Sequence, residues 1–393
     1  MALGIHDVLN RLGQYPHRRA GSENELYARE ELAVPLEGIP GLFITEEPFN
    51  TPGTPLVALA LTALGLIACV WAAGFLAGII SAAALALVVL MTLVADGRGG
   101  PLSWFLARLE TANLVASKGE GRRLVLILAH LDSPLNDSLF RPGQAGYRRQ
   151  ILVGLLVLFV LSAIVPIMAD VGVVPPLWLK WLVSAALLTV VMVAAFDAVR
   201  LGPSPGGNDN LSGVAAATVA ASRLWERLPR GCEVRLVVTS AAGPLRLGAL
   251  DYWRRHRQEL RQRQTLVLAL DCVGAGDLGV VTRFGGLTPV QPDNGLTRLA
   301  GRLMTEDGRF THLKAHRTGL DVPDSLPFMR DGLPGLVIGA RDAAGQVPRR
   351  ARPDDTVAAC DRGLIHEAAL FAEAFVRALP PVRSAASSAV KDR

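Results

Sequence analysis

Residues 56–94 form a stretch of 39 residues without one charged side chain. A membrane-crossing helix needs about 20 apolar residues, so this stretch is too long for a single span. Gly74 lies near its middle, and glycine is a common turn residue. We therefore expect two transmembrane helices here, at about 55–72 and 75–95.

A second pair of apolar segments follows. Residues 151–169 carry no charge, a turn-like segment comes next, and residues 177–196 complete the return. Lys180 lies near one end, where its ammonium group can reach the headgroup region, and Trp178 and Trp181 fit an interfacial aromatic belt. The alternative, buried core helices of a soluble protein, is disfavoured by the lengths of the four segments.

Two hairpins return the chain to the same side of the membrane each time. The flanks on that side carry four arginines, which are Arg98, Arg148, Arg149 and Arg200. The opposite loops offer only Asp170 and Lys180. The positive-inside rule then predicts a multi-pass protein of the plasma (inner) membrane with its soluble domain in the cytoplasm.

Composition agrees with a membrane protein, since 50% of the residues are hydrophobic and only 19% are charged. The net charge is +5, but no zinc finger, basic zipper or RNA-binding signature occurs, so we expect no nucleic-acid partner. A basic balance beside apolar segments suits anionic lipid headgroups. The four cysteines are scattered without a Cys-x-x-Cys pair, which disfavours a disulfide framework or a zinc ribbon.

The remaining segments alternate between strand and helix patterns. The continuous apolar run at 124–129 is typical of a strand buried on both faces, and the segments at 233–240 and 265–270 are interpreted as two further strands. Helical patterns at 210–228, 248–260, 293–305 and 361–378, with a further strand at 335–339, complete the alternation. This order predicts an α/β domain with a mixed, mostly parallel sheet covered by helices on both faces.

Acidic and imidazole groups follow two of these strands and open one helix. His130 and Asp132 come directly after the first strand, Asp271 directly follows the third, and Asp209 precedes the helix at 210–228. Open α/β sheets place their sites at the carboxyl ends of strands. Imidazole and carboxylate together suit zinc, and one carboxylate can bridge two ions. Taken singly, each residue also fits a structural role, such as a helix cap for Asp209.

Six segments give the chain its resemblance to a known family. They are HRRAGSENELYARE (17–30), ANLVASKGEGRRLVLILAHLDS (112–133), GGNDNLSGVAAATVAAS (206–222), LALDCVG (268–274), PDSLPFMRDGLPGLVIG (323–339) and RARPDDTV (350–357). In these segments the sequence resembles the family-28 metallopeptidases, which are two-zinc aminopeptidases with glutamate carboxypeptidase-like and nicastrin-like members. The third segment is the most specific match, because it resembles the family's Gly-x-x-Asp-Asn-x-Ser-Gly helix start.

The resemblance implies a zinc-aminopeptidase-like three-layer αβα domain and roles for four residues. His130 and Asp271 would be terminal ligands of one zinc, Asp209 the bridge to a second, and Asp132 the carboxylate that orients His130. The expected organisation is aminopeptidase-like domain at 1–54, 96–150 and 200–380, transmembrane hairpins at 55–95 and 151–199, and a disordered tail at 381–393.

The chain departs from the family where the second metal and the general base belong. Ala242 and Gly243 stand at the family's Glu-Glu pair, and Ala351 stands at its last histidine. The family's Asp-His pair becomes Asp324-Ser325. Losing a positioned base typically costs about 10²–10⁴-fold in rate. We therefore expect a pseudopeptidase that binds one zinc ion or none.

Several alternatives stay open. One is an active mononuclear zinc hydrolase, in which Arg349, Arg350 and Arg352 either bind an anionic substrate group or lie in a solvated loop. Transport is disfavoured, since the four spans carry almost no ionisable group. The expected partners are the lipid bilayer, a peptide or a partner membrane protein, and a second copy of the chain packed through Gly74, Gly78 and Ala82.

Overall fold

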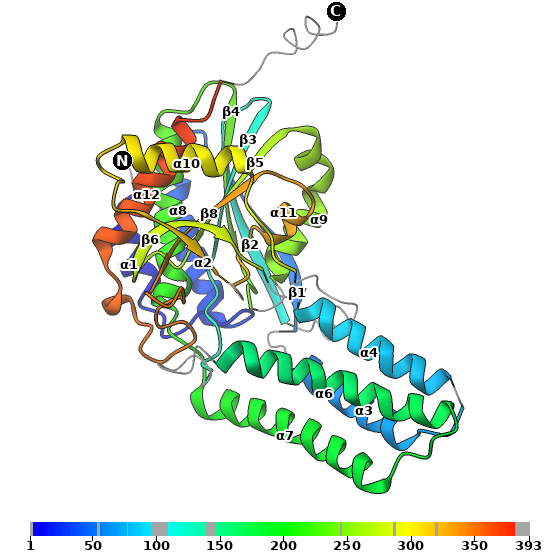
Figure 1. Ribbon diagram of the computed structural model, residues 1–393. Helices are drawn as coiled ribbons and strands as arrows, with labels where there is room; N and C mark the ends of the chain where they lie inside the picture. Colours follow the sequence, from blue (N-terminus) through cyan, green and yellow to red (C-terminus); the bar gives the residue numbers. More distant parts are fainter. Residues whose placement is uncertain are drawn as a thin grey trace, which may run out of the picture.

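The computed structural model describes residues 3–52, 56–76, 78–95, 109–137, 147–243, 246–285, 288–318 and 321–381. Arg98 and nearly all of the predicted disordered tail lie outside these residues. Within them the chain forms a sheet domain and, to one side, a bundle of apolar helices (Figure 1).

Eight strands of the described residues form one mixed sheet in the order β1-β2-β4-β3-β5-β8-β6-β7. The four central strands, β4, β3, β5 and β8, run parallel to one another. Both flanks add antiparallel pairings, so the predicted mixed sheet is found with its parallel part in the centre. The strands are β1 (Phe43–Thr51), β2 (Leu109–Lys118), β3 (Arg123–His130), β4 (Cys232–Thr239), β5 (Gln264–Asp271), β6 (Asp277–Arg283), β7 (Lys314–Arg317) and β8 (Gly335–Arg341).

The central strands read as continuous apolar runs because both faces of the sheet are covered. Along β3, Val125 and Ile127 belong to one hydrophobic cluster, while Leu124 and Leu126 belong to a second cluster on the other face. Helices α8 and α12 cover the first face together with α1, α2 and α10, and α9 and α11 cover the second (Figure 1). These helices are α1 (Ile5–Leu12), α2 (Glu23–Glu37), α8 (Ser212–Glu226), α9 (Leu247–Gln262), α10 (Asn294–Glu306), α11 (Leu326–Arg330) and α12 (Arg362–Arg377).

Within the described residues, four apolar helices make the bundle: α3 (Leu56–Trp71), α4 (Ile79–Ala95), α6 (Tyr147–Asp170) and α7 (Leu177–Leu201). By length and composition, α6 and α7 can cross a membrane, whereas α3 and α4 are shorter apolar helices. A helix rises about 1.5 Å per residue, so the 16 residues of α3 span less than a hydrocarbon core of about 30 Å. Two of the four predicted spans therefore meet the length criterion.

The bundle has its own packing. Ala63, Leu66 and Leu187 are fully buried in it, and the indole Nε1 of Trp71 donates to Ser184 Oγ at 3.1 Å. Gly74 and Gly78 have φ angles of +94° and +80° and lie in the turn between α3 and α4. Neither glycine lies on a helix, and packing of a second copy of the chain through Gly74, Gly78 and Ala82 stays a prediction.

The bundle joins the sheet domain beside the loops that follow β3. The Asn136 Nδ2 donates to the carbonyl oxygens of Leu201 and Pro203, at 2.8 and 3.1 Å. The Ser204 N–H donates to Pro134 O at 2.9 Å. The end of α7 is thus fixed to the segment that leaves the carboxyl end of the sheet, and that end faces the bundle.

Candidate metal centre

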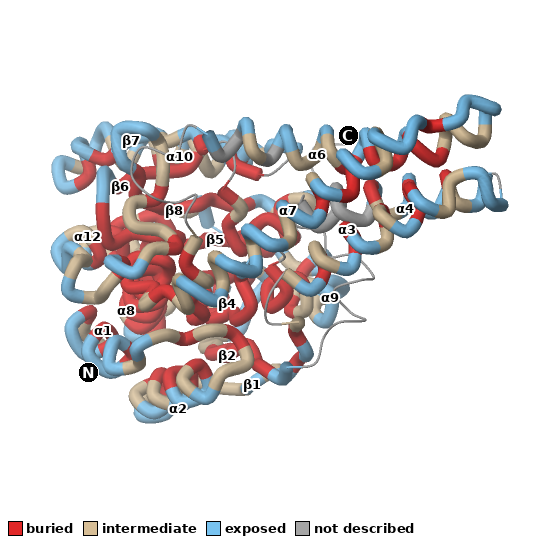
Figure 2. Tube along the Cα trace, turned by 90° about the horizontal axis from the view of Figure 1, so that it is seen from below, coloured by how far each residue is buried: buried red, intermediate tan, exposed pale blue. Residues whose placement is uncertain are grey.

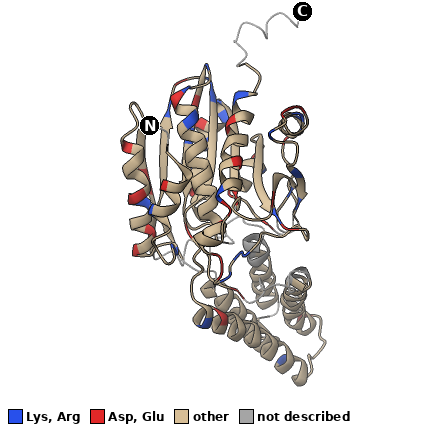
Figure 3. Ribbon diagram, turned by 90° about the vertical axis from the view of Figure 1, so that its left-hand side faces the viewer, with Lys and Arg blue, Asp and Glu red and all other residues tan. Residues whose placement is uncertain are grey.

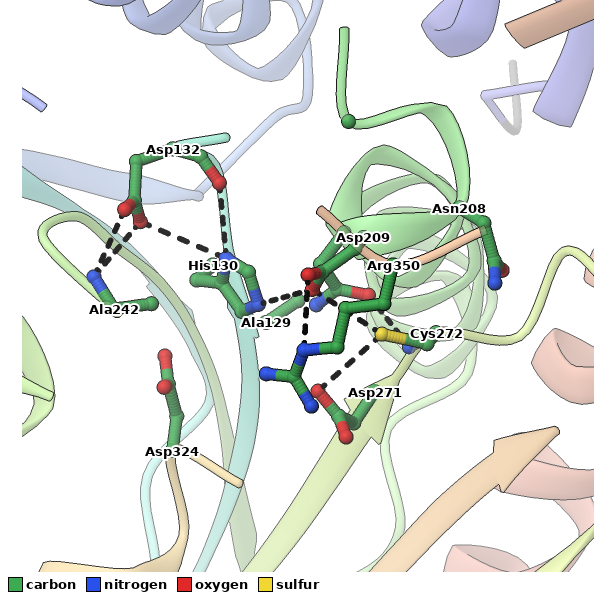
Figure 4. A network of polar contacts seen from close by, with 12 residues as sticks. Ala129, His130, Asp132, Asn208, Asp209, Ala242, Asp271, Cys272, Asp324 and Arg350 are labelled. Carbon is green, nitrogen blue, oxygen red and sulfur yellow. Dashed lines mark hydrogen bonds and ion pairs between the residues drawn. The ribbon is translucent and has the colours of Figure 1, made fainter. Parts of the chain in front are cut away.

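His130, Asp209 and Asp271 come together at the carboxyl end of the sheet (Figure 4). Each offers one ligand atom, and these atoms lie within 4.8 Å of one another. His130 ends β3 and Asp271 ends its parallel neighbour β5, while Asp209 comes from the turn η2 (Gly207–Leu211) that leads into α8. All three are buried, with exposed fractions of 4%, 1% and 3% in that order. The sequence-predicted ligand set is therefore assembled in space.

The two ring nitrogens of His130 face different partners. Its Nδ1 lies 3.1 Å from the carbonyl oxygen of Asp132 and 3.6 Å from Asp132 Oδ1. Its Nε2 faces Asp209 Oδ1 at 3.4 Å, yet this buried nitrogen makes no hydrogen bond within the described residues. Burial disfavours charge on the ring, but the contacts with Asp132 and Asp209 outweigh burial and raise the pKa of His130 to about 10.

This arrangement fits one zinc ion. A tetrahedral zinc lies about 2.0–2.2 Å from nitrogen and oxygen ligands, which separates the ligands by roughly 3.3 Å. The separation between His130 Nε2 and Asp209 Oδ1 is 3.4 Å, and the nitrogen has no other hydrogen-bond partner among the described residues. His130, Asp209 and Asp271 would hold the ion, and zinc supplies Lewis acidity when bound.

The turn that carries Asp209 is fixed by hydrogen bonds from both sides. The Asp355 carboxylate accepts the backbone N–H groups of Asn208 and Asp209, at 2.7 and 3.1 Å. The Asn210 Oδ1 accepts the N–H of Cys272 at 2.8 Å, which ties the turn to the end of β5. Burial raises the pKa of Asp355 to about 7.

Arg18 joins the two loops that carry the ligands. Its Nε donates to Leu131 O at 3.0 Å, its Nη2 donates to Gly206 O at 2.7 Å, and its backbone N–H donates to Ser133 Oγ at 2.9 Å. The side chain is fully buried, and burial lowers the pKa of Arg18 to about 10. Arg18, which belongs to the 17–30 segment, thus positions the loops on both sides of the site.

A chain of four ion pairs links the two carboxylate ligands, and the sequence did not reveal it. Asp209 Oδ2 lies 3.2 Å from Arg350 Nε, and Arg350 Nη1 donates to Asp321 Oδ1 at 3.0 Å. Asp321 Oδ2 lies 3.2 Å from Arg341 Nε, and Arg341 Nη2 donates to Asp271 Oδ2 at 3.3 Å. Burial opposes ionisation of Asp209, but Arg350 and His130 hold the pKa of Asp209 below its usual value.

The arginines near position 351 have separate partners. Arg350 is directed into the site, with 15% of its side chain exposed. Arg349 donates to Ala359 O at 2.9 Å, and Arg352 pairs with Asp354. The three side chains therefore do not form one anion-binding group, and Arg350 does not lie in a solvated loop.

The thiol of Cys272 lies against the same two carboxylates. Its Sγ is 3.3 Å from Asp209 Oδ1 and 3.8 Å from Asp271 Oδ1. Cys272 is fully buried, and burial, with the nearby carboxylates, raises the pKa of its thiol well above the usual value. A neutral thiol therefore donates to Asp209.

The positions at which the resemblance expects glutamates and a histidine offer no ligand side chain. The backbone N–H of Ala242 donates to both oxygens of Asp132, at 2.9 and 3.0 Å. Gly243 is exposed, and Ala351 is buried with a φ angle of +52°. These three residues therefore offer no side-chain donor for a second zinc ion.

Asp324 is a buried carboxylate near Ala242. Figure 4 shows its side chain directed towards the space between Ala242 and His130. Its Oδ1 lies 3.5 Å from Arg246 Nη1, and its Oδ2 accepts the hydroxyl of Thr239. Burial raises the pKa of Asp324. The sequence placed Asp324 in a motif but gave no sign of this approach to His130.

Sequence comparison decides the family. The profile of peptidase family M28 matches residues 182–376. Over this region the chain belongs to peptidase family M28. The match begins inside α7 and includes Asp209 and Asp271. No curated protein sequence matches this M28 member significantly.

Solved structures share its fold. A leucine aminopeptidase precursor from Bacteroides thetaiotaomicron is 12% identical, with 94% of this chain and 95% of that chain covered and a TM-score of 0.56. A glutaminyl cyclase from the same organism is 12% identical, with 95% and 99% covered and a TM-score of 0.56. An aminopeptidase from Aneurinibacillus is 14% identical, with 95% and 92% covered and a TM-score of 0.55. At these identities the likeness concerns the fold.

Proposed function

We propose that this M28 member is a membrane-anchored pseudopeptidase whose aminopeptidase-like domain serves as a binding or scaffold module. The single observation that carries the proposal lies at Ala242. Where the family resemblance expects a catalytic glutamate, a buried backbone N–H binds Asp132. Without a positioned base, peptide hydrolysis loses about 10²–10⁴-fold. The fold and the His130 position are kept, which suits recognition rather than turnover.

The exposed apolar surface of the bundle supports anchoring in lipid. Only 28% of the apolar segment in α6 and 17% of that in α7 are buried, whereas a core helix is mostly buried. Figure 2 shows exposed positions along the bundle, and Figure 3 shows few charged residues there. We propose hairpins at 55–95 and 151–199 that hold all four helices in the membrane, with the shorter pair reaching part of its thickness.

The orientation of the site supports a partner that lies close to the bilayer. The segment after β3 is hydrogen-bonded to the end of α7 through Asn136, so the carboxyl end of the sheet faces the bundle. We propose a peptide or a partner membrane protein as the ligand, and a cytoplasmic position for the sheet domain. A second copy of the chain is a further candidate partner.

A mononuclear zinc hydrolase, acting on peptides or other amides, is the second candidate function. Asp324 favours it, because this buried carboxylate is directed towards the vacated base position (Figure 4). Asp324 would then accept a proton while zinc lies at His130, Asp209 and Asp271. The pairing of Asp324 with Arg246 and Thr239 weighs against this role, since both contacts occupy its oxygens.

The test is an aminopeptidase assay on full-length protein in detergent. Fluorogenic aminoacyl amides and unlabelled peptides would be incubated with added zinc, with and without 1,10-phenanthroline. We expect the wild type to release no more product than Asp209→Asn. Chelator-sensitive release that Asp209→Asn abolishes would overturn the pseudopeptidase. Loss of that release in Asp324→Asn, but not in the exposed control Asp354→Asn, would establish the second candidate.

A further inference from the structure

In each of the two carboxylate ligands, Asp209 and Asp271, one oxygen is paired with an arginine. Asp209 Oδ2 faces Arg350, and Asp271 Oδ2 faces Arg341, at 3.2 and 3.3 Å. Asp209 Oδ1 faces His130 Nε2. A single ion between His130, Asp209 and Asp271 can therefore bind the Oδ1 atoms of the two carboxylates, while both guanidinium groups stay paired with the Oδ2 atoms.

Asp321 makes the two arginines into one continuous network. It bridges them through its two oxygens, Oδ1 to Arg350 and Oδ2 to Arg341. Three carboxylates and two guanidinium groups carry a formal net charge of minus one. One divalent cation brings this network to plus one, and a second would bring it to plus three. Buried charge without balancing partners is costly, so the network favours one divalent ion at most.

The position of Arg350 in the chain is informative. It directly precedes Ala351, the residue at the position of the family's last histidine. Its neighbours Arg349 and Ala351 both have positive φ angles, +58° and +52°, which residues with a Cβ atom rarely adopt. This backbone aims the side chain of residue 350, rather than 351, at Asp209. Asp209 therefore has a cation beside its Oδ2 atom, although residue 351 is an alanine rather than the family's histidine.

We propose that Arg350, linked through Asp321 to Arg341, replaces the second metal ion of a two-metal site. Its guanidinium screens the repulsion between Asp209 and Asp271, so the ligand set keeps its geometry with one divalent ion or with none. This inference rests on the proposed function, because a working two-metal peptidase needs a second ion beside Asp209, where Arg350 pairs with the carboxylate. It assigns Arg350 a positioning role.

Thermal unfolding of full-length protein in detergent tests this role. For the wild type we expect that adding EDTA to remove metal lowers the Tm by less than about 2 °C. Metal-free Arg350→Gln should unfold at least about 5 °C below metal-free wild type, and added zinc should recover most of the loss. Zinc affinity, measured by competition with a chromophoric chelator, should rise at least about tenfold in Arg350→Gln, because a cation next to the ion is removed. Arg352→Gln is the matched control, since among the described residues the Arg352 side chain pairs with Asp354 alone, in a more exposed position.

Each outcome decides the proposal. Equal metal-free stability of Arg350→Gln and wild type would overturn it, and so would two zinc ions per wild-type chain. If Arg350→Gln does not fold with or without zinc, Arg350→Lys decides, because lysine keeps the charge. Recovery in Arg350→Lys supports the replacement of a cation, and failure there contradicts it. Peptide release by the wild type would instead contradict the proposed function, and the separate aminopeptidase assay measures this release.

Discussion

The backbone N–H of Ala242 donates to both carboxylate oxygens of Asp132, at 2.9 and 3.0 Å. Asp132 in turn faces Nδ1 of His130. A residue that cannot act as a base therefore still supports the carboxylate that orients the histidine. The position of His130 is therefore supported although residue 242 offers no catalytic side chain.

Asp132→Asn should weaken zinc binding. A carboxylate that orients a ligating histidine typically contributes about 10–100-fold in metal affinity. The asparagine amide keeps one acceptor for the Ala242 N–H, so the fold should persist. Competition titration with a chromophoric chelator measures the change, and the exposed Asp354→Asn should leave affinity unchanged. Equal affinity in both variants would show that Asp132 does not orient His130.

Arg18→Ala should destabilise the sheet domain by about 3 kcal/mol, because it removes charged donors from the buried carbonyl groups of Leu131 and Gly206. Urea unfolding followed by tryptophan fluorescence measures the loss. Arg11→Ala is the control, since the pair of Arg11 with Glu31 is exposed and should contribute about 0–1 kcal/mol. A similar small loss in both variants would mean that Arg18 does not hold the two loops together.

The sequence predicted the central strands and the ligand set because both depend on local patterns. Strands β3, β5 and β8 begin and end within two residues of the apolar runs that predicted them. The carboxyl ends of β3 and β5 adjoin, which brings His130 and Asp271 together with Asp209. Two adjacent parallel strands and one motif at a helix start were sufficient to predict this part of the site.

The ion-pair chain could not be predicted in the same way. Arg341 ends β8, Arg350 lies in an irregular loop and Asp321 precedes α11, so no fixed spacing links them. Their contact depends on how the two loops that carry Asp321 and Arg350 fold over the end of β8. Strand β1 was missed for another reason, since Glu46, Glu47 and Pro48 interrupt its apolar pattern at the edge of the sheet.

Stability at acid pH should depend on Glu259. Ion pairs with Arg235 and Arg263, at 2.7 and 3.0 Å, hold the pKa of Glu259 at about 2, below its unfolded value of 4.5. These pairs therefore stabilise the fold above pH 4.5, and their contribution is lost as the pH falls towards 2. Glu259→Gln should unfold at a lower temperature than wild type at pH 6, and the difference should narrow between pH 5 and 3. A constant difference would show that ionisation of Glu259 is not the cause.

Labelling of introduced cysteines should reveal the sidedness of the membrane bundle. Val174 is 87% exposed in the turn between α6 and α7, and Glu120 is exposed in the turn between β2 and β3. In intact cells, a membrane-impermeant maleimide should label Val174→Cys and spare Glu120→Cys until the membrane is permeabilised. The unsubstituted chain gives the background from its native cysteines. The reverse pattern would place the sheet domain outside the cytoplasm.

Zinc stoichiometry tests the central claim most directly. Full-length protein saturated with zinc, freed of unbound metal and measured by plasma mass spectrometry against chain concentration should hold at most one ion. His130, Asp209 and Asp271 provide that one position, and Arg350 takes the place of the other. Two zinc ions per chain would contradict the account, because they would require ligands that Ala242, Gly243 and Ala351 do not supply.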